Sequence, residues 1–149
     1  MNDIPPDLSK WGQSRPPSGK PMMDEGHAFH HFFGMTLEQA EQMFAENALY
    51  YAEDLMWMPG ACLQYYLVAF CNYLLSNASI GDSDGASSFF TIVEDQSAAI
   101  AGNHDLIARV DDVLSRLEAK QDWYDASVEI YGDFGELSRK CRKLIQTAR

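Results

Sequence analysis

Residues 61–75 have the sequence ACLQYYLVAFCNYLL, in which only Gln64 and Asn72 are polar. A helix that is apolar on every side has no face for solvent, so it belongs in the interior of a protein. The run is shorter than the roughly 20 apolar residues that cross a bilayer, and its length is typical of a buried core helix. The sequence therefore predicts a central helix over about residues 60–76, with other helices packed around it.

Signals for another helix lie directly before this run. Thr36 and Gln39 match a capping box, and apolar residues recur at steps of three and four from there to Met58. Asn47 can divide this helix in two. Pro59 ends it and stands at a permitted position for starting the central helix.

The second half of the chain also carries helix patterns. Helices are expected over about residues 86–101, 104–120 and 133–147, and Asn103 can cap the second of them. No run alternates strictly between apolar and polar residues, so strands are not expected. The fold class is therefore all-α, a compact bundle of about five or six helices.

Residues 1–26 differ from the rest in composition. Five prolines with several Gly and Ser residues prevent regular structure there. Scattered apolar residues such as Trp11 suit an extended strap on the domain or on a neighbouring copy, and a free tail is the alternative. We expect a Pro-rich N-terminal arm over residues 1–26 and a single helical domain over residues 27–149, with a homodimer through the arm left open.

The charge balance limits the classes of partner. The chain of 149 residues carries 22 acidic and 11 basic side chains, for a formal net charge of −11. Nucleic acids and anionic lipids need clustered Lys and Arg, so neither nucleic acid nor membrane is expected as a partner. Solubility alone can also account for an acidic chain.

The two charges are distributed unevenly along the sequence. Residues 21–108 contain acids but neither Lys nor Arg, whereas residues 136–149 are mainly basic. The sequence therefore predicts an acidic body and a basic C-terminal helix. The acids must pair with that helix, with Arg109, Arg116 or Lys120, or with a partner molecule.

Three histidines are the strongest candidates for chemistry. His27, His30 and His31 are close in sequence, and a helix would place His27 and His31 on one side, where both could bind a metal ion. Residues 27–33 can be one helical turn or an extended lead-in, and neither an HExxH motif nor a Cys at zinc spacing accompanies them. A metalloprotein or enzyme that uses these residues, with His104, is thus an alternative, beside simple packing of the histidines.

Other catalytic and cofactor patterns are missing. The loop at residues 81–85 (GDSDG) lacks the Gly and Glu that a calcium loop requires, so it is expected to cap the next helix. The three cysteines form no CxxC, and we expect buried reduced thiols. No signal peptide is recognised at the N-terminus. The sequence predicts a cytoplasmic protein without catalysis or cofactor.

Residues 50–58 (YYAEDLMWM) are the most unusual surface candidate. A helix cannot bury all of these large side chains on one face, so Tyr50, Met56 or Trp57 must cover a second neighbour or remain exposed beside carboxylates. Aromatic anchors with acidic companions are typical of a protein-binding face. A helix packed between two layers is the alternative.

Four segments also suggest a family. Residues 34–40 (GMTLEQA), 51–58 (YAEDLMWM), 65–67 (YYL) and 81–84 (GDSD) resemble small acidic helical proteins of bacteria, many of them uncharacterised and some of them immunity proteins of polymorphic toxin systems. The resemblance implies a non-enzymatic binder that blocks a toxin made by the same cell. Nuclease toxins are basic because they bind phosphates, and an acidic cover would suit them.

The leading hypothesis is an acidic protein-binding module, in which the partner is a basic protein. The residues predicted to bind it are Glu53, Asp54, Trp57, Asp82, Asp84, Glu94 and Asp95. The alternatives are a metal-binding protein or enzyme that uses His27, His30 and His31, and a self-associating structural module.

Overall fold

The computed structural model describes residues 3–14 and 23–149, and that part of the chain is helical and contains no strand. The prediction of an all-α fold is confirmed. Its helices are α1 (Leu8–Trp11), α2 (Asp24–Phe32), α3 (Leu37–Leu55), α4 (Gly60–Leu75), α5 (Ser83–Asp95), α6 (Ser97–Ala101), α7 (His104–Ala119), α8 (Val128–Tyr131) and α9 (Phe134–Ala148). Short 3-10 turns occur at Gly12–Ser14, Asn77–Ser79 and Gln121–Tyr124.

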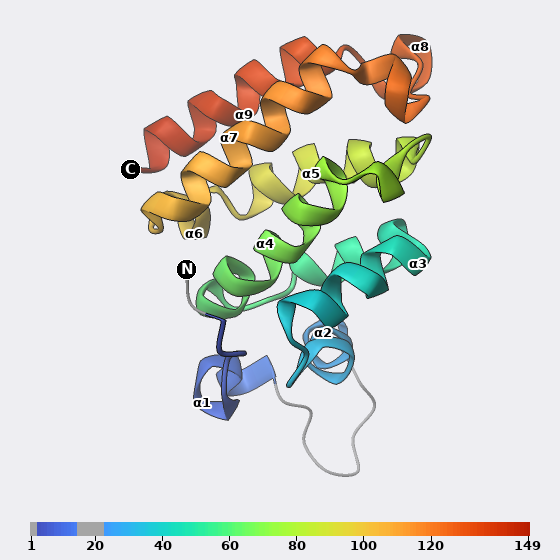
Figure 1. Ribbon diagram of the computed structural model, residues 1–149. Coiled ribbons are helices and arrows are strands. Elements are labelled where there is room, and N and C mark those ends of the chain that lie inside the picture. Colours follow the sequence, from blue (N-terminus) through green and yellow to red (C-terminus); the bar gives the residue numbers. More distant parts are fainter. Residues whose placement is uncertain (1–2, 15–22) are drawn as a thin grey trace.

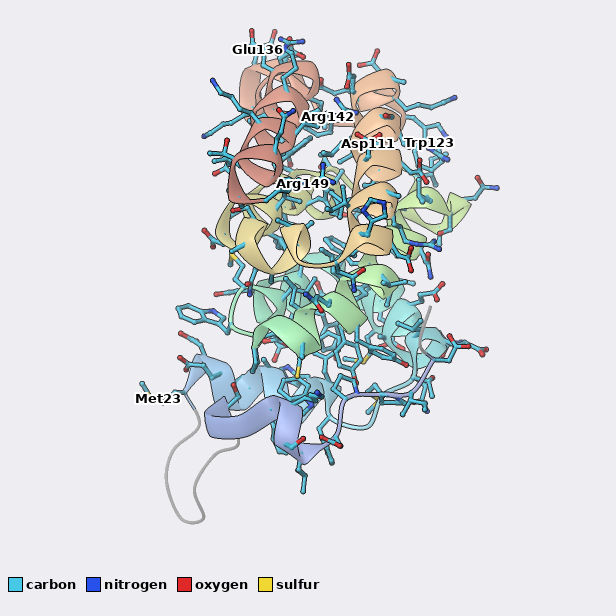
Figure 2. All side chains as sticks on the ribbon, turned by 90° about the vertical axis from the view of Figure 1, so that its left-hand side faces the viewer. Met23, Asp111, Trp123, Glu136, Arg142 and Arg149 are labelled. Atoms are coloured by element: carbon cyan, nitrogen blue, oxygen red, sulfur yellow. The ribbon has the colours of Figure 1, made fainter. Side chains whose placement is uncertain are left out.

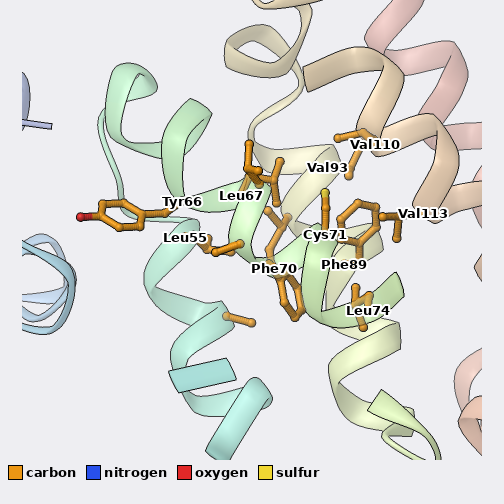
Figure 3. Packing of buried hydrophobic residues seen from close by; sticks show 14 of the residues in the cluster. Leu55, Tyr66, Leu67, Phe70, Cys71, Leu74, Phe89, Val93, Val110 and Val113 are labelled. Atoms are coloured by element: carbon orange, nitrogen blue, oxygen red, sulfur yellow. The ribbon is translucent and has the colours of Figure 1, made fainter. Parts of the chain in front are cut away.

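The helix α4 lies in the middle of the molecule, as its apolar sequence predicts. Helices α2 and α3 lie on one side of it and α7 and α9 on the other (Figure 1). Its Phe70 ring lies 4.7 Å from the ring of Phe44 in α3 and 6.0 Å from that of Phe89 in α5. Figure 3 shows Phe70 and Cys71 of α4 among buried side chains of the surrounding helices. One core thus joins the two sides of the molecule.

The two polar residues of α4 connect it to its neighbours. The Gln64 side chain donates to the carbonyl of Ala99 at 2.8 Å. The Asn72 amide donates to Glu41 at 3.3 Å and accepts from Arg109 at 2.6 Å. Because these groups are bonded, they fit into a helix that is otherwise apolar on every side.

Local capping follows the sequence closely. Thr36 and Gln39 form both bonds of the capping box at the start of α3, and Asn103 accepts from the amide of Leu106 at the start of α7. Within α3, Asn47 leaves the helical conformation with φ −159° and ψ 81°, and its side chain accepts from the amide of Tyr50 at 3.3 Å. Asn47 therefore ends one half of α3 and caps the other.

The helix expected over about residues 86–101 differs in the structure. It begins earlier, at Ser83, and divides at Gln96 into α5 and α6. The Gln96 side chain donates to the carbonyls of Leu55, Met56 and Met58 at the end of α3, at 2.9, 3.3 and 3.1 Å. These carbonyls would otherwise lack partners, so a contact distant in sequence explains the break.

The N-terminal segment is not entirely extended. Residues 8–14 form α1 and a 3-10 turn, with Asp7 accepting from the amides of Ser9 and Lys10, so the expectation of no regular structure is wrong for these residues. Trp11 is fully buried, with its ring 5.5 Å from Phe29 and 6.2 Å from Tyr66. The prolines at positions 16, 17 and 21 lie outside the described residues. In the described part no helix has the length and apolar character to cross a bilayer.

Candidate protein-binding surface

The second half of α3 exposes large side chains to solvent. Leu49 and Tyr50 are each 53% exposed, and Trp57, in the turn after the helix, is 40% exposed. Glu53 is also exposed, and its spacing to the other three places all four on one side of the segment. We call Leu49, Tyr50, Glu53 and Trp57 the α3 face. The structure thus leaves both aromatic candidates at the surface, next to a carboxylate.

Asp54 lies next to this face but is itself buried. It is 7% exposed, and its Oδ2 lies 2.6 Å from Nδ1 of His31 in α2. Burial raises the pKa of the Asp54 carboxyl, and the hydrogen bond with His31 opposes that rise. When the Asp54 carboxyl is ionised it can only accept, and Nδ1 of His31 then donates to it. Asp54 therefore joins α2 to α3 and has little surface left for a partner.

A pocket of about 270 Å³ opens beside this pair. The hydroxyl of Tyr50 lies 3.4 Å from Nε2 of His31 there. Its lining combines acidic, histidine and aromatic side chains, namely Asp24, His27, His31, Tyr50, Glu53, Asp54 and Trp57.

The three clustered histidines all lie in α2. The ring of His31 is 6.2 Å from that of His27 and 5.8 Å from that of His30, and its Nδ1 is taken by Asp54. His104 begins α7, in another part of the fold. Across residues 3–14 and 23–149, no three His, Cys, Asp or Glu side chains form a group that could hold a metal ion. The metal-binding alternative therefore has no assembled ligand set in the described residues.

A second hollow, of about 430 Å³, runs between α3 and α5. We call it the α3–α5 groove. It is lined by Leu49, Ala52, Glu53 and Met56 of α3, by Asp84, Ser87, Ser88, Thr91 and Ile92 of α5, and by Tyr131 of α8. The hydroxyl of Tyr131 donates to Asp84 at 2.8 Å at one end. Leu49 and Glu53 belong to both the groove and the α3 face, so the two form one continuous surface.

Some of the other predicted binding residues already have partners within the chain, and others are exposed. Asp82 caps α5 and also accepts from the hydroxyl of Tyr73 at 2.6 Å, so both of its oxygens are bonded. Glu94 pairs with Lys140 of α9 at 3.2 Å. Asp95 is exposed at the end of α5. Of the predicted set, Glu53, Trp57, Asp84 and Asp95 therefore remain available to a partner.

Among the described residues, the basic helix α9 forms ion pairs through Lys140 and Arg142, and Arg142 pairs with acids of α7. Arg142 donates to Asp111 at 2.8 Å, to Glu118 at 2.9 Å and to the hydroxyl of Ser115 at 2.9 Å. Figure 2 labels Arg142 and Asp111 on these two neighbouring helices. Among the described residues, the only ion pair between α9 and the acids of residues 21–108 is the one at Glu94. In the described part of the chain, the basic helix therefore makes no ion pair with a carboxylate of α3.

The cysteines are buried thiols, as expected. Cys62, Cys71 and Cys141 are free and buried. Burial raises the pKa of Cys62 and of Cys141 to about 12, and it raises that of Cys71 as well. A thiol with so high a pKa forms little thiolate at neutral pH, which is unfavourable for nucleophilic catalysis.

Two parts of this surface were missed from the sequence. The bond between His31 and Asp54 spans 23 positions, and no local pattern indicates it. Leu49 was not singled out, although its spacing of four residues to Glu53, repeated from Glu53 to Trp57, could have indicated a shared exposed side.

The chain matches no protein-family model, no curated protein and no solved structure.

Proposed function

We propose that this chain is a non-enzymatic acidic module that binds a basic protein in the cytoplasm. The observation that carries the proposal is the α3 face, where exposed Tyr50 and Trp57 flank a carboxylate, Glu53, for which the described residues provide no ion pair. Unpaired, reduced cysteines support the cytoplasmic location.

The side chains of the α3 face have the properties of a binding surface. Aromatic residues are enriched among those that contribute most to binding, because they bury a large area at a low entropy cost. Complementary charge accelerates the encounter with a partner and disfavours wrong ones. A net charge of −11 therefore suits a partner of opposite charge.

The resemblance to immunity proteins suggests what the partner is. On this proposal the partner is a basic toxin, such as a nuclease, and the chain inhibits it by covering its phosphate-binding surface. The acids of α3 and α5 would take the place of the phosphates, with Glu53 and Asp84 as the residues that contact basic side chains.

Photo-crosslinking in the cells that produce the chain tests this proposal. A benzophenone amino acid placed at Tyr50, or at Trp57, should form a covalent adduct with a basic protein. The matched control carries the same amino acid at Ile130, which is 77% exposed on α8 and lies outside the α3 face. The partner is then identified by mass spectrometry, and its toxicity is measured with and without the chain.

We expect the yield of adduct to fall as salt is raised in a lysate of these cells, because salt screens the attraction between exposed charges beyond about 8 Å at physiological ionic strength. The proposal fails when the α3 positions give no adduct, when they give the same adducts as Ile130, or when the captured protein is acidic. A basic partner that is not toxic would retain the binding function and remove the immunity role.

A further inference from the structure

The α3–α5 groove has an apolar floor between two low walls. Ala52 and Ile92 are each 1% exposed, whereas Leu49 stands at the edge and is 53% exposed. On the α5 side the wall includes Asp84 together with Ser88 and Thr91, whose side chains are small. A partner backbone can therefore approach closely and insert apolar side chains.

The two helices that line the groove run side by side in the same direction. Near the start of α5, Gly85 lies so close to Ala48 that an added Cβ would meet the Ala48 Cβ at 3.0 Å. Near its end, Gln96 bonds to the carbonyls of Leu55 and Met56. The helices thus stay in contact from one end of the groove to the other.

The charge around the groove is negative. Glu53 contributes to the α3 wall and Asp84 to the α5 wall. Asp95 lies on the same side of α5 as Asp84, because Asp84, Ser88, Thr91 and Asp95 are separated by four, three and four residues. No Lys or Arg belongs to the described lining. An occupant must therefore be apolar along its centre and basic along its edges.

The geometry of the groove selects one type of occupant. Strand addition requires a sheet edge, and the described residues contain no strand. Polyproline recognition requires a groove lined with aromatic rings, and Tyr131 is the only aromatic residue in this described lining. A channel between two packed helices is suited to a third helix.

Building on the proposed function, we infer that the α3–α5 groove binds an amphipathic basic helix of the partner. Apolar side chains spaced three and four apart enter between Leu49, Ala52 and Ile92. Lys or Arg residues on the flanks of that helix face Glu53, Asp84 and Asp95.

Fluorescence anisotropy with a model peptide tests this inference on the full chain. The probe is a labelled peptide of Leu and Lys, ordered so that its helix has one apolar side, and the control is a peptide of the same composition in scrambled order. We expect the ordered peptide to bind about tenfold more tightly than the scrambled one, since only the former presents a continuous apolar side.

A matched pair of substitutions locates the site. Thr91→Trp places a large ring in the groove and should weaken the ordered peptide about tenfold. Thr147→Trp makes the same change at an exposed position of α9 and should leave binding unchanged. Circular dichroism of both variants verifies that the fold is retained.

A second pair of variants distinguishes the effect of charge in the groove from the effect of the net charge of the chain. Glu53→Gln with Asp84→Asn should weaken the ordered peptide, whereas Asp105→Asn with Glu129→Gln removes the same charge from exposed positions outside the groove and should have a smaller effect. Equal weakening by both pairs would overturn the inference.

The inference is likewise overturned when both peptides bind alike or when Thr91→Trp binds like the native chain. These outcomes leave the proposed function intact, because the cross-linking positions Tyr50 and Trp57 lie outside the groove. Conversely, absence of cross-links at those positions together with peptide binding in the groove would reject the α3 face and retain the groove.

Discussion

The two sides of the central helix use their charged residues in different ways. Between α7 and α9, Arg142 is bonded to Asp111 and Glu118, so opposite charges meet within the chain. On the other side, Glu53 is exposed beside Tyr50 and Trp57. It makes no ion pair with any of the described residues. Exposed carboxylates thus join α7 to α9 on one side, whereas on the other side the exposed Glu53 faces solvent and the buried Asp54 joins α2 to α3.

Replacement of Asp54 is expected to have the largest effect. Asp54→Ala leaves Nδ1 of the partly buried His31 without its partner, and an unsatisfied group costs about 1–3 kcal/mol where water does not reach it. We expect the free energy of unfolding to fall by about 2 kcal/mol, measured by urea denaturation. Asp111→Ala is the control on the other side, and its carboxylate is exposed. Equal losses in the two variants would remove the distinction between the buried and the exposed pair.

The pH dependence of Asp54→Asn stability is a second test of the bond between Asp54 and His31. Burial raises the pKa of this carboxyl, so the folded chain binds its proton at a higher pH than the unfolded chain does. Ionisation of Asp54 therefore disfavours folding above its folded pKa, and this cost disappears as the pH falls. Asp54→Asn keeps an acceptor for His31 without the charge, so it should be at least as stable as the native chain at about pH 7 and lose any advantage near pH 4. An advantage that grows toward acid would contradict the raised pKa.

Loss of Arg142 is expected to have an intermediate effect. Arg142→Ala removes three bonds between α9 and α7, but they are partly exposed, and such pairs contribute about 1 kcal/mol or less. The difference from the native chain should shrink in high salt, as seen in urea denaturation at two ionic strengths. Arg139→Ala is the control, because Arg139 is exposed and makes no ion pair within the described residues. A salt-independent loss would indicate packing rather than charge.

Neutralising Glu53 and Asp84, which make no ion pair within the described residues, is expected to have the smallest effect on folding. Glu53→Gln with Asp84→Asn should change the free energy of unfolding by less than about 0.5 kcal/mol, since substitutions of exposed residues rarely do more. The bond from Tyr131 to Asp84 can be retained, because Asn keeps a side-chain oxygen. Thermal denaturation measures the change, and a large loss would show that these acids stabilise the fold.

Much of the fold could be predicted from local sequence. The apolar run of residues 61–75, the capping box at Thr36 and the cap at Asn103 each depend on residues within one or two turns, and the structure contains all three. The break at Gln96 could not be predicted, because it depends on carbonyls of α3 about 40 residues earlier. Local patterns identify helices, whereas contacts between helices decide where they divide.

The candidate surface was only partly predictable for the same reason. Exposure of Tyr50 or Trp57 follows from the crowding of large side chains in one segment. Burial of Asp54 depends on His31, and the bonds of Asp82 depend in part on Tyr73 of α4. Sequence alone identifies acids but not which of them already have partners in the folded chain.

The interruption of α3 at Asn47 has a consequence for motion. The helix is interrupted there, and the Tyr50 amide donates to the Asn47 side chain through an exposed bond of 3.3 Å. The amides just after Asn47 should therefore exchange with deuterium sooner than those in the middle of the first half of α3. The segment that bears Leu49, Tyr50 and Glu53 can then adjust its orientation while α4 remains protected beneath it.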